Sequence, residues 1–454
     1  MKQEREKFSG RLALLAAFAG SAIGLGNIWR FPYMAGENGG AAFIVIYLLC
    51  SLLVALPIFF TESLLGRSSG KGMVSTIKTF FNGKAGRKWC GLLIVAPLLI
   101  TSFYSVVGGW ALDYFIRACT GVFGRISKEE AVAFFGEYSS SVFEPIISHI
   151  IFLTITAAIV ARGLKKGIEK FNNITVPMLF VLILAIVGYS CSLPGATGGI
   201  NYLLKPDFGK ITPGVLASAM GQSFFSLSLG VGTILVFSSY MRKDESIVTA
   251  GFFTVIFDTV FAILAGFAII PAVFSAGIEA NAGPSLVFET LPYIFASMGD
   301  VSPILSYLVP ILFFLSILGA AITSEISMLE VLVEYFVEEK HLSRRKATFL
   351  CFGVCVAIGI ICSLSFGPLS WIEIRGNNIF GLLDKVSSNL LMILGSLLFA
   401  VVVGWKMDRN KVRSELTNEG TNKVSVKLFP LFYFWVRYIV PVMLVLIFIT
   451  NIFN

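Results

Sequence analysis

The sequence predicts an all-α membrane protein with eleven transmembrane helices, of which the first and the sixth are broken. Three observations predict this fold. Hydrophobic residues make up 56% of the 454 residues and charged residues only 14%, whereas a soluble protein carries roughly a quarter charged residues. The apolar residues gather in eleven stretches that can cross a bilayer, which takes about 20 residues each. Two of these stretches hold glycines and polar residues at mid-depth.

The eleven apolar stretches give the order of the predicted helices. They span residues 11–37, 41–66, 89–118, 145–161, 166–191, 214–238, 247–272, 303–336, 347–366, 377–404 and 430–452. Segment 1–10 is charged and contains acidic residues, which argues against a cleaved signal peptide. The long connection at 273–302 predicts short helices that cap one mouth of the bundle.

Most of the 35 Lys and Arg residues fall in alternate connections, and this asymmetry predicts the orientation. The basic segments are 1–11, 67–88, 162–170, 242–243, 340–346 and 406–427. By the positive-inside rule they face the cytoplasm. The N-terminus is therefore predicted to be cytoplasmic and, after eleven crossings, the C-terminus to be outside. The net charge of +8 then faces anionic lipid head groups and does not indicate a nucleic-acid partner.

The first ten stretches predict two repeats of five helices, at 11–191 and 214–404, with the eleventh helix at 430–452. Because five is odd, the second repeat enters from the opposite side, as in an inverted-topology repeat. The leading stretch of each repeat is interrupted, around Ala22–Gly26 and around Gly221–Gly232. Unpaired backbone cannot face hydrocarbon, so these interruptions are predicted to line a cavity. The alternative is that the glycines and serines only allow intact helices to pack closely.

Cysteine and histidine usage argues against several chemical classes. The chain has seven cysteines without a C-x-x-C pair, and only two histidines. A metal centre with cysteine or histidine ligands is therefore not indicated, and neither is a Ser-His-Asp hydrolase. Cys351 and Cys355 share a helical face, where they are predicted to pack rather than to bind a metal. The sequence predicts a protein that is not an enzyme.

Charged residues inside the apolar stretches need a partner or a function, because a charge at the bilayer centre costs roughly 2.5–3.5 kcal/mol. These residues are Arg30, Glu62, Asp258, Glu325 and Asp384. Arg30 lies about one turn beyond the first interruption, and Asp384 lies near the outer end of the tenth stretch. We expect the two to face each other as an outer gate. The alternative is that each extends separately to the membrane interface.

Two groups of oxygen-bearing residues predict sites for a small hard cation. Ala320, Thr323 and Ser324 share one face of the eighth stretch. Free carbonyls at Gly20 and Ile23 would complete an all-oxygen site opposite this face. The alternative is that the two hydroxyls bond back to carbonyls of their own helix.

The second group of oxygen-bearing residues consists of Asp258, Asn27, Ser226 and the carbonyl of Ala22. Carbonyls at an unwound helix attract cations, while free amides attract anions. The amides of Leu25 and Gly26 are therefore predicted to hold a carboxylate beside the cation.

The segment Gly24-Leu-Gly-Asn-Ile-Trp-Arg-Phe-Pro32, followed by Glu37-Asn-Gly-Gly40, resembles the first-helix signature of the neurotransmitter:sodium symporters. Further matches are Phe224-Phe-Ser-Leu-Ser-Leu-Gly230, Ser238-Ser-Tyr240 and Thr323-Ser324. Eleven helices rather than twelve resemble the bacterial amino-acid branch, which includes transporters of leucine and of several hydrophobic amino acids. The resemblance implies the leucine-transporter (LeuT-type) fold, alternating access and a multi-pass location in the bacterial inner membrane.

The resemblance also implies ligand sets for two sodium ions and an amino acid. The first sodium would be bound by Ala22, Asn27, Ser226 and Asp258, and the second by Gly20, Ile23, Ala320, Thr323 and Ser324. The substrate backbone would contact Leu25, Gly26, Tyr104 and carbonyls near Phe225 and Ser228, with Ala22 and Ser226 beside it. The side-chain pocket would comprise Ile100, Phe225, Ser228, Val231, Ser324 and Met328.

An inner gate between Arg5 and Glu338 is a further implication of the resemblance. Glu338 stands where a relative has aspartate, and Phe8 stands where many members have tryptophan.

Chloride-dependent relatives bind the anion at positions that Tyr47, Gln222 and Ser226 match. Ala262 replaces the serine of that anion site. We therefore expect Asp258 to supply the negative charge and transport to need no chloride.

These features predict sodium-coupled symport of neutral, mainly hydrophobic L-amino acids into the cell. The predicted pocket offers no side chain that could pair with a charged substrate tail. The alternative is a transceptor or regulatory membrane protein that binds an amino acid without net transport. The predicted partners are the amino acid, sodium ions and the lipid bilayer, and the sequence predicts no oligomeric state.

Overall fold

The computed structural model describes residues 6–81, 83–277, 286–300 and 302–453. Helices dominate this part of the chain, and its β contacts are limited to one bridge between Ile374 and Asn377. Because a helix satisfies its backbone groups internally, it is suited to apolar surroundings. The predicted all-α class is confirmed for the described residues.

Nine helices in the described part of the chain are long and apolar enough to cross a membrane. They are Ala41–Ser69, Gly91–Cys119, Glu144–Ala161, Leu164–Ser192, Ile247–Ser275, Pro303–Lys340, Arg344–Leu364, Ile379–Lys406 and Lys423–Asn451. A tenth span forms if Arg11–Ala22 and Gly26–Glu37 are counted as one bent segment. These spans correspond to the predicted stretches except the sixth, and they make the chain an integral multi-pass membrane protein.

The first predicted stretch is broken as expected. Helix α1 (Arg11–Ala22) and the continuation Gly26–Glu37 meet at a bend of 47°. Ile23 between them is extended, with φ −73° and ψ 104°. A π-helical turn at Gly26–Arg30 then leads into α2 (Phe31–Glu37). The helical hydrogen bonding is therefore interrupted within the predicted range.

The sixth predicted stretch forms two short helices, α11 (Pro213–Ser226) and α12 (Thr233–Ser239). In the loop between them, Ser228, Gly230 and Gly232 have φ values of 52°, 80° and 82°, which a right-handed helix cannot contain. The break is narrower than the sequence predicted, because the polar residues that precede Leu227 remain helical. Neither piece is long enough to cross a membrane alone, so the count of eleven helices and the inverted repeat remain predictions.

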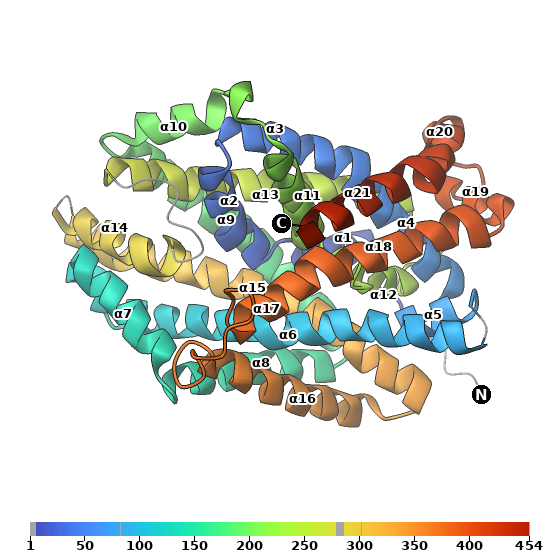
Figure 1. The fold of residues 1–454 in the computed structure, drawn as a ribbon, viewed down its shortest axis with the longest axis horizontal. Coiled ribbons are helices and arrows are strands. Elements are labelled where there is room, and N and C mark those ends of the chain that lie inside the picture. Colours follow the sequence, from blue (N-terminus) through green and yellow to red (C-terminus); the bar gives the residue numbers. More distant parts are fainter. Residues whose placement is uncertain (1–5, 82, 278–285, 301, 454) are drawn as a thin grey trace.

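Short helices lie at both ends of the bundle (Figure 1). Helices α7 (Lys128–Ser140), α10 (Ala196–Leu204) and α14 (Leu291–Ser297) lie at one end. Helices α5 (Met73–Lys78) and α19 (Arg409–Thr417) lie at the other end, near the N-terminus. Short helices predicted for the connection 273–302 are therefore present where that connection is described. Its residues 278–285 and 301 lie outside the described residues.

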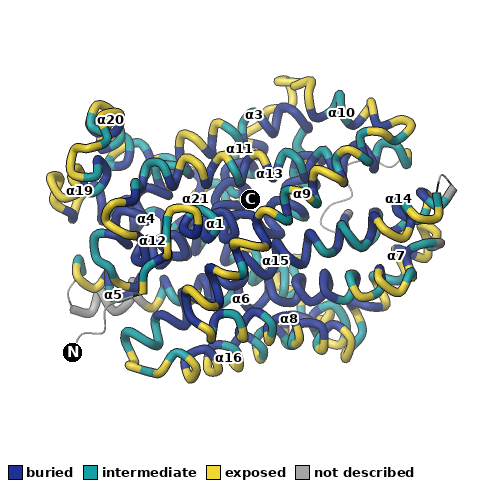
Figure 2. Tube along the Cα trace, turned by 180° about the vertical axis from the view of Figure 1, so that it is seen from behind, coloured by how far each residue is buried: buried dark blue, intermediate teal, exposed yellow. Residues whose placement is uncertain are grey.

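The centre of the bundle is formed by long helices that pack side by side. Helices α6 (Gly83–Cys119) and α15 (Pro303–Lys340) pack along each other, and α9 (Lys170–Ser192) contacts both α1 and α15. In Figure 2 the traces of α1, α12 and α15 are mostly buried, whereas exposed residues gather on outer elements such as α16 (Arg344–Leu364). Exposed apolar side chains on these outer faces are suited to contact with lipid tails.

An aromatic block joins several elements at the end of the bundle that carries α7 and α14. We use this name for Trp110, Phe135, Phe288, Phe366 and Phe380. The centroid of the Trp110 ring lies 5.2–5.9 Å from the centroids of the other four rings. Aromatic pairs at such distances add to the stability that apolar burial provides.

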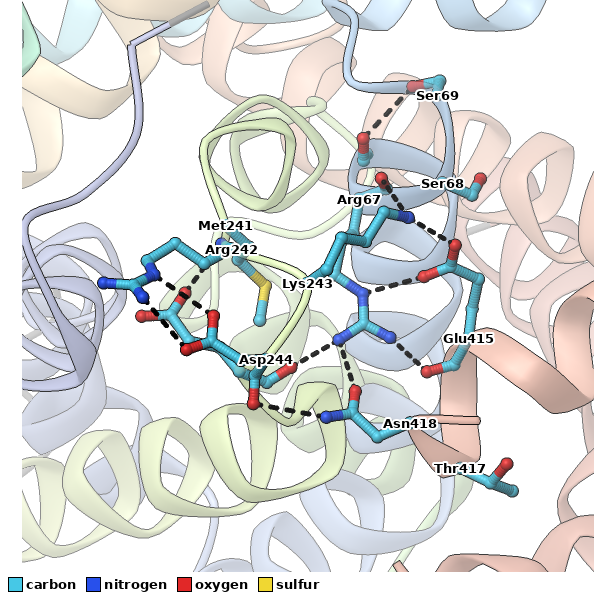
Figure 3. Close-up of polar contacts among 12 residues, drawn as sticks. Arg67, Ser68, Ser69, Met241, Arg242, Lys243, Asp244, Glu415, Thr417 and Asn418 are labelled. Carbon is cyan, nitrogen blue, oxygen red and sulfur yellow. Dashed lines mark hydrogen bonds and ion pairs between the residues drawn. The ribbon is translucent and has the colours of Figure 1, made fainter. Parts of the chain in front are cut away.

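A polar network joins three segments at the opposite end of the bundle (Figure 3). Arg67, near the end of α4 (Leu56–Ser69), is 4% exposed. Its guanidinium donates to the Glu415 carboxylate at 2.9 Å and to the Asn418 side chain at 2.8 Å. Lys243 pairs with the same carboxylate at 2.6 Å. Burial opposes ionisation of Glu415, but the hydrogen bond from Lys243 and the charge of Arg67 outweigh it and lower the pKa of Glu415.

Candidate functional site

The two helix breaks face each other in the middle of the bundle. The hydroxyl of Ser228, in the second break, donates to the carbonyl of Ser21 at 3.0 Å, next to the first break. In the second break the amide of Gly230 donates to the buried carboxylate of Glu62 at 2.7 Å. Non-helical backbone at this depth is therefore partly satisfied by protein groups, and the remaining carbonyls and amides are available to a ligand.

A small cavity lies between the two breaks. Its lining residues are Ala22, Gly24, Gly26, Ile100, Tyr104, Phe225, Ser226, Ser228, Val231, Ser324, Met328 and Met392. All of these lining residues are buried. The structure thus brings together all the residues predicted to bind the substrate except Leu25, whose amide lies beside the cavity.

Backbone groups of the first break lie next to the cavity. The amide of Leu25 donates to the Tyr104 hydroxyl at 2.9 Å. A Cβ atom at Gly24 would lie 2.3 Å from the Ser324 hydroxyl, and one at Gly26 would lie 3.0 Å from the Phe225 ring. Glycine at both positions therefore keeps the peptide groups within reach of a small ligand.

Three side-chain donors converge on the fully buried carboxylate of Asp258 in α13 (Ile247–Ser275). One carboxylate oxygen accepts from the Asn27 amide at 2.8 Å and from the Ser226 hydroxyl at 2.6 Å. The other accepts from the Tyr47 hydroxyl at 2.9 Å. The Asn27 side-chain carbonyl accepts from the amide of Gly24 at 3.1 Å. A buried carboxylate with neighbouring carbonyl and hydroxyl oxygens is suited to a hard cation.

A second group of oxygens lies where α15 crosses the first break. The hydroxyl of Ser324 lies 3.2–3.5 Å from the carbonyls of Gly20, Ser21 and Ile23. The Thr323 hydroxyl lies 3.3 Å from the Ile23 carbonyl and 2.9 Å from the Ala320 carbonyl. Ser324 has one hydroxyl hydrogen and the Ser21 carbonyl also accepts from Ser228, so the carbonyls of Gly20 and Ile23 share the hydroxyls of Ser324 and Thr323. The arrangement therefore holds more acceptors than donors, which favours a cation.

The predicted outer gate is not a direct ion pair in this structure. The guanidinium of Arg30 lies over the Phe225 ring, 4.8 Å from its centroid. The carboxylate of Asp384 accepts from the Ser388 hydroxyl at 2.9 Å. Tyr33 interacts electrostatically with both Arg30 and Asp384. The role of this pair as a gate stays a prediction.

The N-terminal segment packs against the opposite side of the bundle. The amide of Phe8 donates to the Tyr240 carbonyl at 3.2 Å, and its ring contacts the rings of Phe237 and Tyr240. Glu338 accepts from the amide of Gly72 at 2.8 Å. Arg5 lies outside the described residues, so the predicted inner gate stays a prediction.

Sequence reasoning missed two residues that line the cavity, Gly24 and Met392. Gly24 lies within the predicted break, so its position next to the cavity could have been inferred. Met392, in α18 (Met392–Val401), carries no such signal because it is one apolar residue within an apolar stretch. The described residues contain no group of three or more histidine, cysteine or acidic side chains that could hold a metal ion. The two oxygen groups offer carboxylate, carbonyl and hydroxyl oxygens, which are the ligands that hard cations prefer.

Comparison with known proteins identifies the family. The chain matches the model of the sodium:neurotransmitter symporter family over residues 5–127 and 135–454. An uncharacterized sodium-dependent transporter of Bacillus subtilis is 34% identical over 99% of this chain and 98% of the relative. An uncharacterized sodium-dependent transporter of Haemophilus influenzae is 33% identical over 99% of both chains.

A solved structure agrees with this family. The crystal structure of MhsT in complex with L-phenylalanine superposes with a TM-score of 0.90 and 37% sequence identity, covering 98% of this chain and 100% of that chain. The sequence prediction of the family is confirmed. The chain belongs to the sodium:neurotransmitter symporter family, whose members are sodium-dependent transporters and not enzymes.

Proposed function

We propose that the protein couples the entry of sodium to the uptake of neutral, mainly hydrophobic L-amino acids. The observation that carries this proposal is the position of the Asp258 oxygen cluster, which shares Ser226 with the wall of the cavity. A cation at Asp258 and a carboxylate in the cavity would stabilise each other. By linkage, each then raises the affinity for the other.

Two sodium ions are part of the proposal. The first is bound by Ala22, Asn27, Ser226 and Asp258, together with the substrate carboxylate. The second is bound by Gly20, Ile23, Ala320, Thr323 and Ser324. The carbonyls of Gly20, Ile23 and Ala320 support the second site, because a cation would satisfy them more fully than the two hydroxyls of Ser324 and Thr323 can.

The substrate is proposed to lie with its carboxylate at the amides of Leu25 and Gly26 and at the Tyr104 hydroxyl. Its ammonium group would face carbonyls near Phe225 and Ser228. Its side chain would extend toward the apolar wall, which is formed by Ile100, Val231, Met328 and Met392. An apolar wall of this kind excludes charged tails, and the methionines adapt to side chains of different shape. The binding of L-phenylalanine by the similar MhsT supports this class of substrate.

Transport is proposed to follow alternating access in an eleven-helix inverted repeat within the bacterial inner membrane. The N-terminus is cytoplasmic and the C-terminus is outside in this proposal. Arg30 and Asp384 close the outer path, and Arg5 and Glu338 close the inner path. The burial of the residues that line the cavity supports a mechanism in which both paths can be shut at once.

Chloride independence is proposed because donors that could hold an anion are occupied by Asp258. Tyr47 and Ser226 both donate to its carboxylate, and Gln222 donates to the carbonyl of Gly26 at 2.7 Å. A fixed carboxylate also repels a nearby anion. We expect uptake to be unchanged when chloride is replaced by gluconate, and a loss of uptake in gluconate would contradict this part of the proposal.

The deciding experiment is uptake of labelled leucine, phenylalanine, tyrosine and tryptophan into proteoliposomes. An inward sodium gradient should drive accumulation above equilibrium, and an equal potassium gradient should not. Labelled lysine and glutamate serve as charged controls that should not accumulate. Sodium-dependent binding without accumulation would instead favour the transceptor, and absence of both would reject the proposal.

A further inference from the structure

Asn172 is a polar side chain buried without a partner beside the second group of oxygens. It lies in the first turn of α9 and is 0% exposed. Neither its side-chain oxygen nor its side-chain nitrogen has a hydrogen-bond partner among the described residues. Leaving a buried polar group unsatisfied costs about 1–3 kcal/mol. An unsatisfied buried amide therefore indicates that a polar ligand, such as a cation or a water molecule, binds beside it.

The Asn172 side chain points at Gly20. A Cβ atom at Gly20 would lie 2.8 Å from Asn172 Oδ1 and, from α15, 3.3 Å from Thr323 Cβ. The backbone of α1 at this point is therefore held between α9 and α15. The carbonyl of the same glycine lies 3.5 Å from the Ser324 hydroxyl. One glycine thus separates the unpartnered amide from the oxygen group at Ser324.

A second contact between α9 and α15 lies next to Asn172. Thr175, about one turn further along α9, meets Gly319 of α15, where a Cβ atom would lie 3.2 Å from its methyl group. Asn172 and Thr175 therefore follow the same face of α15 that carries Ala320 and Thr323. An amide oxygen on this face is chemically equivalent to the backbone carbonyls around it, and hard cations accept both as ligands.

We propose that Asn172 Oδ1 is a further oxygen ligand of the cation at Gly20 and Ser324, reached directly or through one bridging water. This inference rests on the proposed sodium coupling and adds a ligand from α9, an element to which no cation contact is otherwise assigned. A polar residue is tolerated at this buried position because its side-chain oxygen binds the cation instead of another side chain. A water bridge would transmit nearly the same stabilisation as a direct contact.

Three variants of the full-length protein in detergent test the proposal. Asn172→Leu keeps the number and branching of the side-chain heavy atoms and removes the oxygen, Asn172→Asp adds a charge, and Asn173→Leu is the control. Asn173 is the same residue type at the next position, but it is exposed. The sodium affinity is measured from the rise in melting temperature with sodium at constant ionic strength, with potassium as the replacement ion.

We expect Asn172→Leu to weaken sodium affinity about tenfold, the equivalent of about 1.4 kcal/mol. Its melting temperature in potassium alone should be equal to or above that of the wild type, because an unsatisfied polar group has been removed. Asn172→Asp should bind sodium more tightly, and Asn173→Leu should match the wild type. A purely structural asparagine would change the melting temperature in potassium without changing the sodium dependence.

Sodium affinity of Asn172→Leu within twofold of the wild type would overturn the proposal. If that variant does not fold, an unchanged sodium affinity of Asn172→Asp overturns it instead. Failure of the proposed function looks different, because the wild type itself would then show no sodium-dependent stabilisation.

Discussion

The carboxylate of Asp258 accepts three side-chain hydrogen bonds. These hydrogen bonds determine how a substitution of Asp258 would affect the protein. The donors orient the carboxylate but do not neutralise it, since all three are uncharged groups. The negative charge is therefore available to a cation at the same place. This separates two contributions of Asp258, its shape in the packed core and its charge.

Asp258→Asn tests the charge with little change of shape. We expect the sodium concentration for half-maximal amino-acid uptake to rise at least about tenfold, because a buried unit charge beside a cation contributes several kcal/mol. The melting temperature without sodium should change little. The matched control is Asp244→Asn, in a connecting loop where Asp244 pairs with Arg242. Unchanged sodium dependence in Asp258→Asn would contradict the assignment of the first site.

The sequence predicted the cavity-lining residues better where a helix break and a family motif coincide than where only the packing of helices places a residue at the cavity. Tyr104, Phe225 and Ser324 line the cavity as predicted. Met392 was missed because it is one apolar residue within an apolar stretch. Its position in the cavity depends on how distant helices pack, which a single sequence does not encode in a readable pattern.

At the scale of elements, the second break depends on backbone conformations that few residues tolerate. Gly230 has φ 80°, and a Cβ atom there would lie 1.9 Å from the carbonyl oxygen of Met392. The loop of the sixth stretch is thereby seated directly on α18. A side chain at this position would both strain the loop and push the tenth predicted span away.

Gly230→Ala should therefore reduce folded protein strongly, through a cost of several kcal/mol. Gly221→Ala, in α11, is the matched control, because a Cβ atom there meets no atom within 4 Å. It should be neutral or slightly stabilising, since alanine is the better helix former. The yield of monodisperse protein and its melting temperature are the measurements, and equal behaviour of the two variants would contradict this account.

The breaks illustrate how far element boundaries follow from sequence. The first break was predicted at Ala22–Gly26, and the extended residue is Ile23. The second was predicted to begin at Gly221, but α11 continues through Ser226. Gln222 and Ser223 are compatible with a helix, because the Gln222 amide donates to the Gly26 carbonyl and the Ser223 hydroxyl donates to the Met220 carbonyl of its own helix. Polarity alone therefore overestimates the length of the break.

For the whole molecule, the network in Figure 3 links parts of the chain that are far apart in sequence. Arg67 of α4, Lys243 of a connecting loop and Glu415 of α19 meet there. Arg67 is almost fully buried, so removal of its partner would leave a poorly compensated charge. Breaking such a pair costs more than the loss of an exposed ion pair.

Glu415→Gln should lower stability by about 1–3 kcal/mol at neutral pH. The pKa of Glu415 is lowered in the folded protein, so its contribution is present above the ordinary glutamate value near 4.5 and is lost as the pH falls through the folded value. The difference in melting temperature between wild type and Glu415→Gln should therefore shrink below about pH 4.5. Glu137→Gln on the exposed side of α7 is the control. A difference that stays constant with pH would contradict the role of this carboxylate.

The aromatic block around Trp110 provides a reference point for measuring how far other helices move during transport. Its five rings join α6, α7, the turn Leu286–Thr290, the chain just after α16 and α17 (Ile379–Val386). We therefore expect a spectroscopic label beside them, for example at exposed Val132 of α7, to keep its place throughout a transport cycle. Any change in its separation from a second label on α2 would then report the displacement of the bent segment itself.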